Sequence, residues 1–107
     1  METLAHMEMQ DLQKKISQGT YVLFFTADWC PDCNFIKPAI PEIEKDFADA
    51  HFITINRDDN LELAADFGIM GIPSFVVMQD GKETARLVNK KRKTKEEVEA
   101  FLNQALN

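Results

Sequence analysis

A strand-length apolar run that ends just before a pair of cysteines restricts the fold of this chain more than any other feature. Residues 21–26, Tyr-Val-Leu-Phe-Phe-Thr, are almost all apolar or β-branched, which is typical of a central strand covered on both faces. Cys30 and Cys33 follow, and beyond them apolar residues recur at the 3.6-residue period of a helix as far as Phe47. The sequence therefore predicts a strand, a short turn, and a helix that carries both cysteines at its N-terminus.

Prolines and turn residues divide the rest of the chain into elements. Pro31 suits the first helical position, where a missing N–H costs nothing, whereas Pro38 and Pro41 should kink or interrupt the same helix. Asp80-Gly81 is a hairpin signal. The other predicted elements are helices at 9–16, 61–67 and 94–106 and strands at 52–56, 74–78 and 83–88, with the last helix opening on a capping-box pair, Thr94 and Glu97.

The order of these elements predicts an α/β fold. A strand–helix–strand unit in the first half should pair its strands in parallel with a right-handed crossover, and the second half adds an antiparallel hairpin and a helix. We therefore expect a mixed central sheet of four to five strands, flanked by helices on both faces. The chain has 107 residues, of which 45% are hydrophobic, so we expect one domain over residues 1–107 that needs no structural staple.

The charge and the N-terminus narrow the setting in which the cysteines act. Residues 1–9 have neither a positive n-region nor an apolar h-region, and no apolar run approaches a membrane span, so we expect a cytoplasmic protein without a membrane partner. Thiols stay reduced there, and a cysteine pair is then more often catalytic or metal-binding than structural. A formal charge of −6 argues against nucleic acid as a partner. The basic residues include one cluster, which we expect to be a solvated loop and helix start: Lys90, Lys91, Arg92, Lys93 and Lys95.

The spacing of the cysteines predicts thiol–disulfide exchange. At a helix N-terminus, free N–H groups and the helix dipole stabilise a thiolate, and CxxC thiols of this kind have pKa values of ~7 instead of ~8.5. We therefore expect Cys30 to attack a substrate disulfide and Cys33 to resolve the mixed disulfide. Asp32 opposes the dipole, and at about 4 to 8 Å its charge is worth roughly 1 to 4 kcal/mol. It should therefore hold the pKa of the Cys30 thiol higher and make the couple more reducing.

Two other functions fit a CxxC pair. A zinc site normally needs four ligands, and only His6 and His51 remain as candidates, neither at a motif spacing from the cysteines. A metal-binding module would therefore need ligands shared between two chains, and we expect no metal. A non-catalytic interaction domain is the second alternative, since a fold alone does not establish activity.

The order of the motifs resembles the thioredoxin superfamily over nearly all of the chain. The resemblance rests on Ala27-Asp-Trp-Cys-Pro-Asp-Cys33 after an apolar strand, Pro38 eight residues after Cys30, Gly71-Ile72-Pro73 before the third strand, and Gly81 in the hairpin. It implies a thioredoxin fold and a thiol–disulfide oxidoreductase that reduces disulfides without a bound cofactor. The implied partners are disulfide-containing proteins or small disulfides, and an NADPH-dependent reductase similar to thioredoxin reductase as electron donor. We expect the chain to be a monomer.

The resemblance also implies roles for four residues around the cysteines. Pro73 should follow a cis peptide bond, with the Ile72 backbone facing the cysteines and offering hydrogen bonds to an extended substrate. Trp29 would flank the pair as an exposed aromatic platform, although a half-buried core position fits its sequence nearly as well. Pro31 would belong to the same substrate-binding surface.

Some positions near the cysteines depart from the family pattern. Pro31-Asp32 replaces the usual Gly-Pro, which makes the motif similar to Trp-Cys-Pro-Asp-Cys proteins that tend to reduce small disulfides. Phe24 and Thr54 stand where the family usually has a buried aspartate and its partner lysine. Proton transfer at Cys33 must then involve another group or water, and Asp32 is the nearest titratable candidate.

Two departures lie farther from the motif. Asn89 replaces an expected glycine and precedes the basic residues 90–93, and such a rim should favour anionic substrates over flat protein docking. The N-terminal residues leave little room for the first strand of a full thioredoxin, which we expect to be short or missing.

Overall fold

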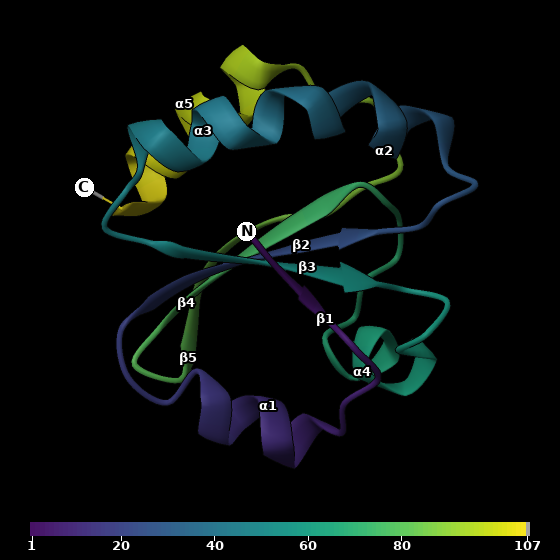
Figure 1. Cartoon of the computed structure of the whole chain (residues 1–107), viewed down its shortest axis with the longest axis vertical. Coiled ribbons are helices and arrows are strands. Elements are labelled where there is room, and N and C mark those ends of the chain that lie inside the picture. The colour runs from purple at the N-terminus through teal and green to yellow at the C-terminus, as the bar shows by residue number, and fades with distance from the viewer. Residues whose placement is uncertain (107) are drawn as a thin grey trace.

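The apolar run before the cysteines forms strand β2, Thr20–Thr26, at the centre of the sheet. In the computed structural model, which describes residues 1–106, β2 pairs in parallel with β3, His51–Asn56, and antiparallel with β4, Ser74–Gln79. Strand β5, Lys82–Leu87, completes the hairpin with β4, and the order across the sheet is β1-β3-β2-β4-β5 (Figure 1). The expected α/β architecture with a mixed sheet is confirmed.

The N-terminal edge of the sheet is a very short strand. β1, Glu2–Leu4, pairs in parallel with residues 53–55 of β3 and spans only three residues. Leu4 is its one buried residue, so β1 adds backbone pairing at the edge and little core. The first strand is therefore present but short, as the limited room before the first helix predicts.

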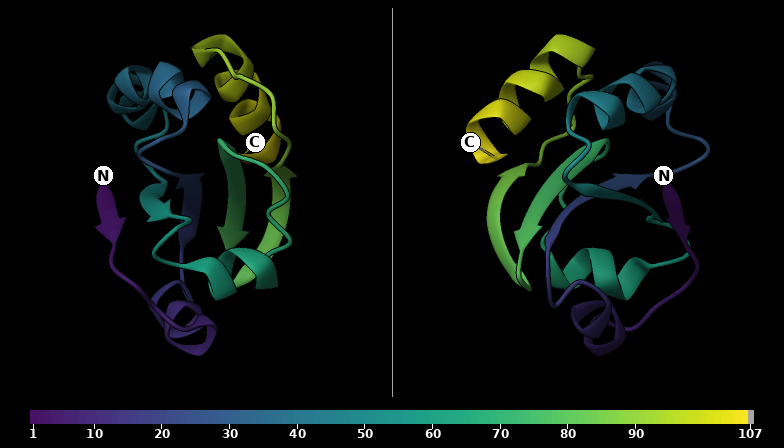
Figure 2. Two further views of the ribbon diagram at one scale, coloured as in Figure 1. Left: turned by 90° about the vertical axis from the view of Figure 1, so that its right-hand side faces the viewer. Right: turned by 60° about the vertical axis from the view of Figure 1, so that its left-hand side comes forward.

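Helices cover both faces of the sheet, as the sequence predicts. One face carries α1, Met9–Lys15, and α4, Leu61–Asp66, and the other carries α2, Pro31–Ile36, α3, Ile40–Asp46, and α5, Lys95–Leu106 (Figures 1 and 2). A 3₁₀ turn, η1 at Lys37–Ala39, separates α2 from α3. Pro38 lies inside this turn and Pro41 in the first turn of α3, so the predicted interruption is present where the prolines remove backbone donors.

Alternate residues of β2 point into two separate cores. Leu23 and Phe25 pack on the side of the sheet that α1 and α4 cover, and Val22 and Phe24 pack on the side of α2, α3 and α5. The Phe24 ring stacks on Phe75 of β4 with the ring centroids 4.9 Å apart. Fully burying one such side chain contributes roughly 1.5–3 kcal/mol, which explains why this strand is apolar on both faces.

Two turn signals read from the sequence have the expected geometry. Asp80 and Gly81, with φ angles of 50° and 83°, form the tight turn between β4 and β5. The Thr94 hydroxyl accepts a hydrogen bond from the Glu97 N–H at 3.1 Å, so Thr94 caps α5. Both turns depend on residues close in sequence, which is why local patterns locate them.

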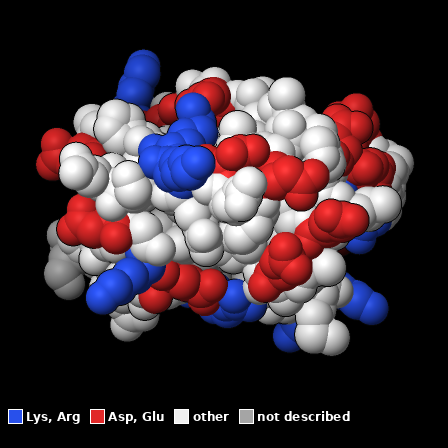
Figure 3. All heavy atoms as spheres, turned by 90° about the horizontal axis from the view of Figure 1, so that it is seen from below, with Lys and Arg blue, Asp and Glu red and all other residues white. Residues whose placement is uncertain are grey.

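The face covered by α1 and α4 presents mixed charge to the solvent. Seen from below in Figure 3, carboxylates are prominent and Lys and Arg side chains are interspersed among them. Within residues 1–106, none of the helices is both long enough and apolar enough to cross a membrane.

Candidate active site

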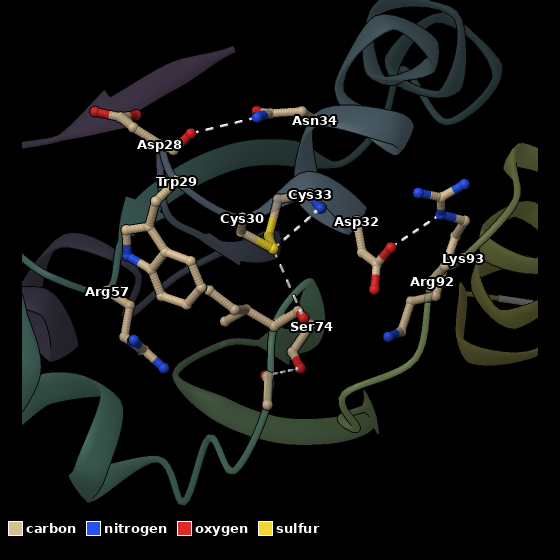
Figure 4. Close-up of a disulfide and its surroundings, with 12 residues drawn as sticks. Asp28, Trp29, Cys30, Asp32, Cys33, Asn34, Arg57, Ser74, Arg92 and Lys93 are labelled. Atoms are coloured by element: carbon tan, nitrogen blue, oxygen red, sulfur yellow. Dashed lines mark hydrogen bonds and ion pairs between the residues drawn. A yellow bond between two sulfur atoms is a disulfide. The ribbon is translucent and has the colours of Figure 1, made fainter.

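The two cysteines lie beyond the end of β2, where the chain turns into α2. Cys30 is the N-cap residue, Pro31 occupies the first helical position, and Cys33 lies within the first turn. The Cys33 N–H donates a hydrogen bond to the Cys30 Sγ at 3.1 Å, and the two sulfurs form a disulfide with the Cα atoms 5.2 Å apart (Figure 4). This Cα separation is ordinary for a disulfide, so the pair can be bridged without displacing the backbone.

Burial distinguishes the two cysteines. Cys30 keeps 4% of its surface exposed, whereas Cys33 is 0% exposed. The Cys30 Sγ also lies 3.9 Å from the Ile72 carbonyl oxygen. A substrate can therefore reach only Cys30, and the sulfur of this residue is also the one that accepts an amide hydrogen bond. Such a bond stabilises a thiolate more than a thiol.

The loop before β4 places the Ile72 backbone against the cysteines. The Ile72–Pro73 peptide bond is cis, as the resemblance implies. Ser74 Oγ donates a hydrogen bond to the Gly71 carbonyl at 2.5 Å. A Cβ atom on Gly71 would lie 2.6 Å from the carbonyl carbon of Asn89, so glycine is required here by the close approach of the 89–93 segment.

Trp29 lies on the outer side of the cysteines with 58% of its surface exposed, so it is not the half-buried core residue that its sequence also allowed. Its indole N–H donates to Asp58 Oδ2 at 2.8 Å, and the Arg57 guanidinium carbon lies 5.2 Å from a ring centroid. The sequence patterns did not identify Arg57 or Asp58 as neighbours of the site. Both residues directly follow β3, and adjacent parallel strands end at the same edge of a sheet, so this signal was available.

A polar turn after β3 holds Asp58 in place. Asn56 Oδ1 accepts a hydrogen bond from the Asp58 N–H at 2.8 Å. Asn60 is fully buried, donates from Nδ2 to the Asn56 carbonyl at 3.1 Å and accepts from the Met7 N–H at 2.9 Å. These bonds satisfy the buried Asn60 amide and tie the turn to the segment before α1.

Asp32 points toward Arg92, on the other side of the disulfide from Trp29 (Figure 4). The Arg92 Nε donates to Asp32 Oδ1 at 2.9 Å, and the guanidinium carbon lies 4.4 Å from the centroid of the Phe35 ring. The sequence patterns placed the charge of Asp32 beside Cys30 but did not identify Arg92 as the partner of its carboxylate. Its cation comes from 60 residues farther along the chain, a distance over which local patterns carry no information.

Lys93 contradicts the expectation that the whole basic cluster is solvated. The residue is 0% exposed, and its Nζ donates to Asn89 Oδ1 at 2.9 Å and to the Lys91 carbonyl oxygen at 2.7 Å. Burial lowers the pKa of the Lys93 ammonium, and the negative charges of Glu97 and Asp32 oppose this shift. The segment before α5 is therefore a folded loop around a buried cation.

The thioredoxin family model matches residues 3–104, which is nearly the whole sequence. This chain belongs to the thioredoxin family. The thioredoxin of Bacillus subtilis (strain 168) is 31% identical over 98 residues, which cover 91% of this chain and 92% of that protein. Thioredoxin H2-2 of Oryza sativa subsp. japonica is 37% identical over 86 residues, which cover 80% of this chain and 62% of that protein. The match thus spans less than two thirds of the rice relative.

Solved thioredoxin structures have the same fold as this chain. The X-ray structure of Fasciola hepatica thioredoxin superposes with a TM-score of 0.83 at 29% identity, covering 98% of this chain and 99% of that one. The crystal structure of thioredoxin NaTrxh from Nicotiana alata gives a TM-score of 0.79 at 27% identity, covering 97% and 92%. The predicted thioredoxin fold is confirmed.

In this thioredoxin-family chain, an aromatic ring occupies the position of the buried aspartate. Phe24 is buried and pairs across the sheet with Thr54, whose hydroxyl contacts the Met1 sulfur. Both residues line a hollow of about 520 Å³ together with Thr26, whose hydroxyl is buried without a hydrogen-bond partner among the described residues. Position 24 therefore offers no carboxylate.

The histidines named as possible zinc ligands have other neighbours. His6 Nδ1 lies 2.8 Å from the Asp59 carbonyl oxygen, and this hydrogen bond is the main reason that the pKa of His6 is raised. The His51 ring packs on Tyr21 with centroids 5.2 Å apart. In the part of the chain that the structure describes, no three His, Cys, Asp or Glu side chains are grouped so as to hold a metal ion.

Proposed function

We propose that this thioredoxin-family protein is a thiol–disulfide oxidoreductase that reduces disulfides through Cys30 and Cys33. The observation that carries the proposal is the asymmetry of the pair, because Cys30 alone has an exposed edge and its sulfur accepts the Cys33 N–H at 3.1 Å. An amide hydrogen bond favours the thiolate, which is the nucleophilic form of cysteine. Relatives named thioredoxin support the same activity.

Each catalytic cycle would move two electrons from the protein to the substrate. The Cys30 thiolate attacks one sulfur of the substrate disulfide, so that a mixed disulfide forms while the substrate S–S bond breaks and the departing thiolate takes up a proton. Cys33, after losing its own proton, attacks the Cys30 sulfur and displaces the second substrate thiolate. The substrate leaves as two thiols, and the protein is left with the Cys30–Cys33 disulfide.

We assign substrate contacts to Trp29, Pro31, Ile72 and Pro73. The Ile72 carbonyl lies 3.9 Å from the Cys30 Sγ, which supports pairing of its backbone with an extended substrate segment. The exposed Trp29 ring offers apolar contact area beside it.

We assign Asp32 an electrostatic role in the cycle. Its carboxylate is held by Arg92 at 2.9 Å, and Cys33 is fully buried. This arrangement favours water over Asp32 as the group that exchanges a proton with Cys33.

The partners follow from the same chemistry. Disulfide-containing proteins and small disulfides are the proposed substrates, and an NADPH-dependent enzyme similar to thioredoxin reductase is the proposed electron donor. The exposed Lys90 and Lys91 favour substrates that carry carboxylates or phosphates. We also propose a monomer in the cytoplasm, where the compartment keeps the pair reduced and ready for the next substrate.

The test is reduction of insulin, with dithiothreitol and then thioredoxin reductase with NADPH as electron donors. The native chain should accelerate the reaction, and Cys30→Ser should abolish it. Cys33→Ser should accumulate a mixed disulfide with the substrate, because no thiol remains to resolve it. Equal labelling of both cysteines by iodoacetamide in the reduced protein, or a Cys33→Ser variant that traps nothing, would contradict the assigned roles.

A further inference from the structure

The basic loop, residues 89–93, lies beside the cysteines and takes no part in the thiol chemistry described above. It folds around the Lys93 ammonium, which donates to Asn89 Oδ1 at 2.9 Å and to the Lys91 carbonyl at 2.7 Å. These partners are uncharged, and Lys93 is fully buried. Burying an ammonium is costly unless its hydrogen bonds are satisfied, so the loop oxygens must stay where they are for Lys93 to stay inside.

The basic loop also packs against Gly71, the residue before Ile72. A Cβ atom on Gly71 would lie 2.6 Å from the carbonyl carbon of Asn89 and 2.6 Å from Lys90 Cγ. The loop therefore leaves no room for a side chain on Gly71. Lys93 shapes the loop, and Gly71 fixes its position next to the active site.

From its position in the basic loop, Arg92 makes two contacts with α2. Its Nε donates to Asp32 Oδ1 at 2.9 Å, and its guanidinium carbon lies 4.4 Å from the Phe35 ring centroid. Asp32 and Phe35 are three residues apart and therefore lie on neighbouring positions of one helix face. A lone exposed ion pair contributes little, but an arginine that also stacks on a ring has a more fixed orientation.

We propose that Arg92 is a positioning residue of the active site, which holds the Asp32 carboxylate toward the basic loop and screens its charge from Cys30. Lys93 has the supporting role of placing Arg92. The inference rests on the proposed function, because it concerns Cys30 as a nucleophile. A carboxylate that is paired with a cation opposes thiolate formation less than a free one does. Asp32 and the basic loop thus act on Cys30 as one unit.

The test is the pH dependence of iodoacetamide alkylation of Cys30 in the reduced full-length chain, followed by mass spectrometry. Arg92→Gln frees the Asp32 carboxylate, so it should raise the pKa of the Cys30 thiol by about 0.5 unit and slow alkylation about 3-fold below that pKa. In an Asp32→Asn background, Arg92→Gln should have less than half this effect, because no carboxylate is left to release. Arg92→Lys should restore part of the native profile, since an ammonium keeps the charge without the planar fork.

Lys91→Gln is the matched control. Lys91 is exposed, lies next to Arg92 and carries the same charge, so its loss should shift the profile by less than half as much as Arg92→Gln does. The other charged groups around the cysteines, Asp28, Arg57 and Asp58, are the same in every variant, and their contributions cancel in the comparison.

Lys93→Met tests the same interaction in a second way, because it should move Arg92 away from Asp32. Without the ammonium, the basic loop loses the hydrogen bonds to Asn89 Oδ1 and the Lys91 carbonyl, and Arg92 is no longer held in position. The pH profile of Cys30 alkylation should therefore shift in the same direction as in Arg92→Gln. A thermal melt of each variant shows whether it is folded, and the Arg92 variants decide the question if Lys93→Met is not.

Two results would overturn the inference. One is an equal shift from Arg92→Gln in the native and Asp32→Asn backgrounds, which would make Arg92 a distant charge only. The other is a shift from Lys91→Gln as large as that from Arg92→Gln. Failure of the proposed function looks different, because the native Cys30 would then alkylate no faster than an unactivated thiol and insulin would not be reduced.

Discussion

The two sides of the disulfide use the same three kinds of side chain, an aromatic ring, an arginine and a carboxylate. On the side of Trp29, which we call the platform side, Arg57 lies 5.2 Å from the Trp29 ring centroid and 3.6 Å from Asp58. The other side repeats the combination with Arg92, which lies 4.4 Å from the Phe35 ring centroid and 2.9 Å from the Asp32 carboxylate. The difference lies in where each carboxylate sits.

Asp58 follows β3 and accepts the Trp29 indole N–H at 2.8 Å, so the platform side fixes the orientation of an exposed ring. Asp32 lies between the two cysteines, so the basic-loop side changes the charge next to the sulfurs. From this comparison we expect substitutions on the platform side to change substrate binding and substitutions on the basic-loop side to change thiol reactivity.

The largest effect should come from disrupting the contact between Gly71 and the basic loop, which should lower the free energy of unfolding. Gly71→Ala places a Cβ 2.6 Å from the Asn89 backbone, which must move, so we expect the free energy of unfolding to fall by about 1–3 kcal/mol. Urea denaturation followed by circular dichroism measures this loss. Met70→Ala is the control, because Met70 is 82% exposed and its truncation should change little. Equal stability of the two variants would show that the loop is not held at Gly71.

Removing the platform should affect binding next most strongly. Trp29→Ala removes an exposed ring and should lower kcat/KM for a protein disulfide about 10-fold, which corresponds to about 1.4 kcal/mol, mainly through KM. Trp29→Phe should recover part of the loss. The pH profile of Cys30 alkylation should stay as in the native chain, and a shift as large as that of Arg92→Gln would break the proposed division between the two sides.

A smaller effect concerns the buried cation of the basic loop and its pH dependence. Burial lowers the folded-state pKa of Lys93 below its ordinary value of 10.5, so between these two values the unfolded chain binds more protons than the folded chain. Stability from this group should therefore rise with pH in that window, and the penalty of burying the charge is fully present below it. The native chain should gain stability relative to Lys93→Met as the pH approaches 10.5.

Urea denaturation of the oxidised protein at increasing pH measures this gain, because the bridged cysteines do not titrate. Lys91→Met is the matched control, since Lys91 is exposed and should show no such trend relative to the native chain. Parallel pH curves for the native chain and Lys93→Met would mean that Lys93 titrates like a solvated lysine.

The smallest effect is that of salt. Raising the ionic strength from about 0.1 M to about 1 M shortens the Debye length from about 10 Å to about 3 Å and screens exposed charges. The effect of Arg92→Gln on Cys30 alkylation should then fall below about 2-fold. The Trp29→Ala effect on KM should persist, because apolar contact is not screened. Equal salt sensitivity of both variants would remove the distinction between the two sides.

Local patterns predicted most of the fold. The apolar run of β2, the helix start at Cys30, and the interruption at Pro38 and Pro41 all depend on residues within a few positions of one another. The Asp80-Gly81 turn is of the same kind. Each follows from backbone sterics or from burial of a periodic apolar face, which act within a single element.

The burial and pairing of the charged residues around the cysteines were predicted less well. The sequence predicts a solvated basic cluster, because lysines are mostly exposed in proteins. Lys93 is instead enclosed by oxygens of its own loop. The local sequence did not identify the partner of Asp32, because Arg92 lies 60 residues farther along the chain. Burial and charge pairing depend on which distant segments pack together.

By itself, the sequence determined the reactive element, since a strand that ends at Cys-Pro-Asp-Cys and continues as a helix places one sulfur at free backbone N–H groups through local geometry alone. The tertiary structure decided what surrounds that sulfur, bringing the Ile72 carbonyl from 42 residues away and Arg92 to Asp32. The physical reason is one of range. Backbone preferences act within a turn or two, whereas solvent exclusion and electrostatic pairing depend on spatial neighbours that only the closed sheet and its helices define.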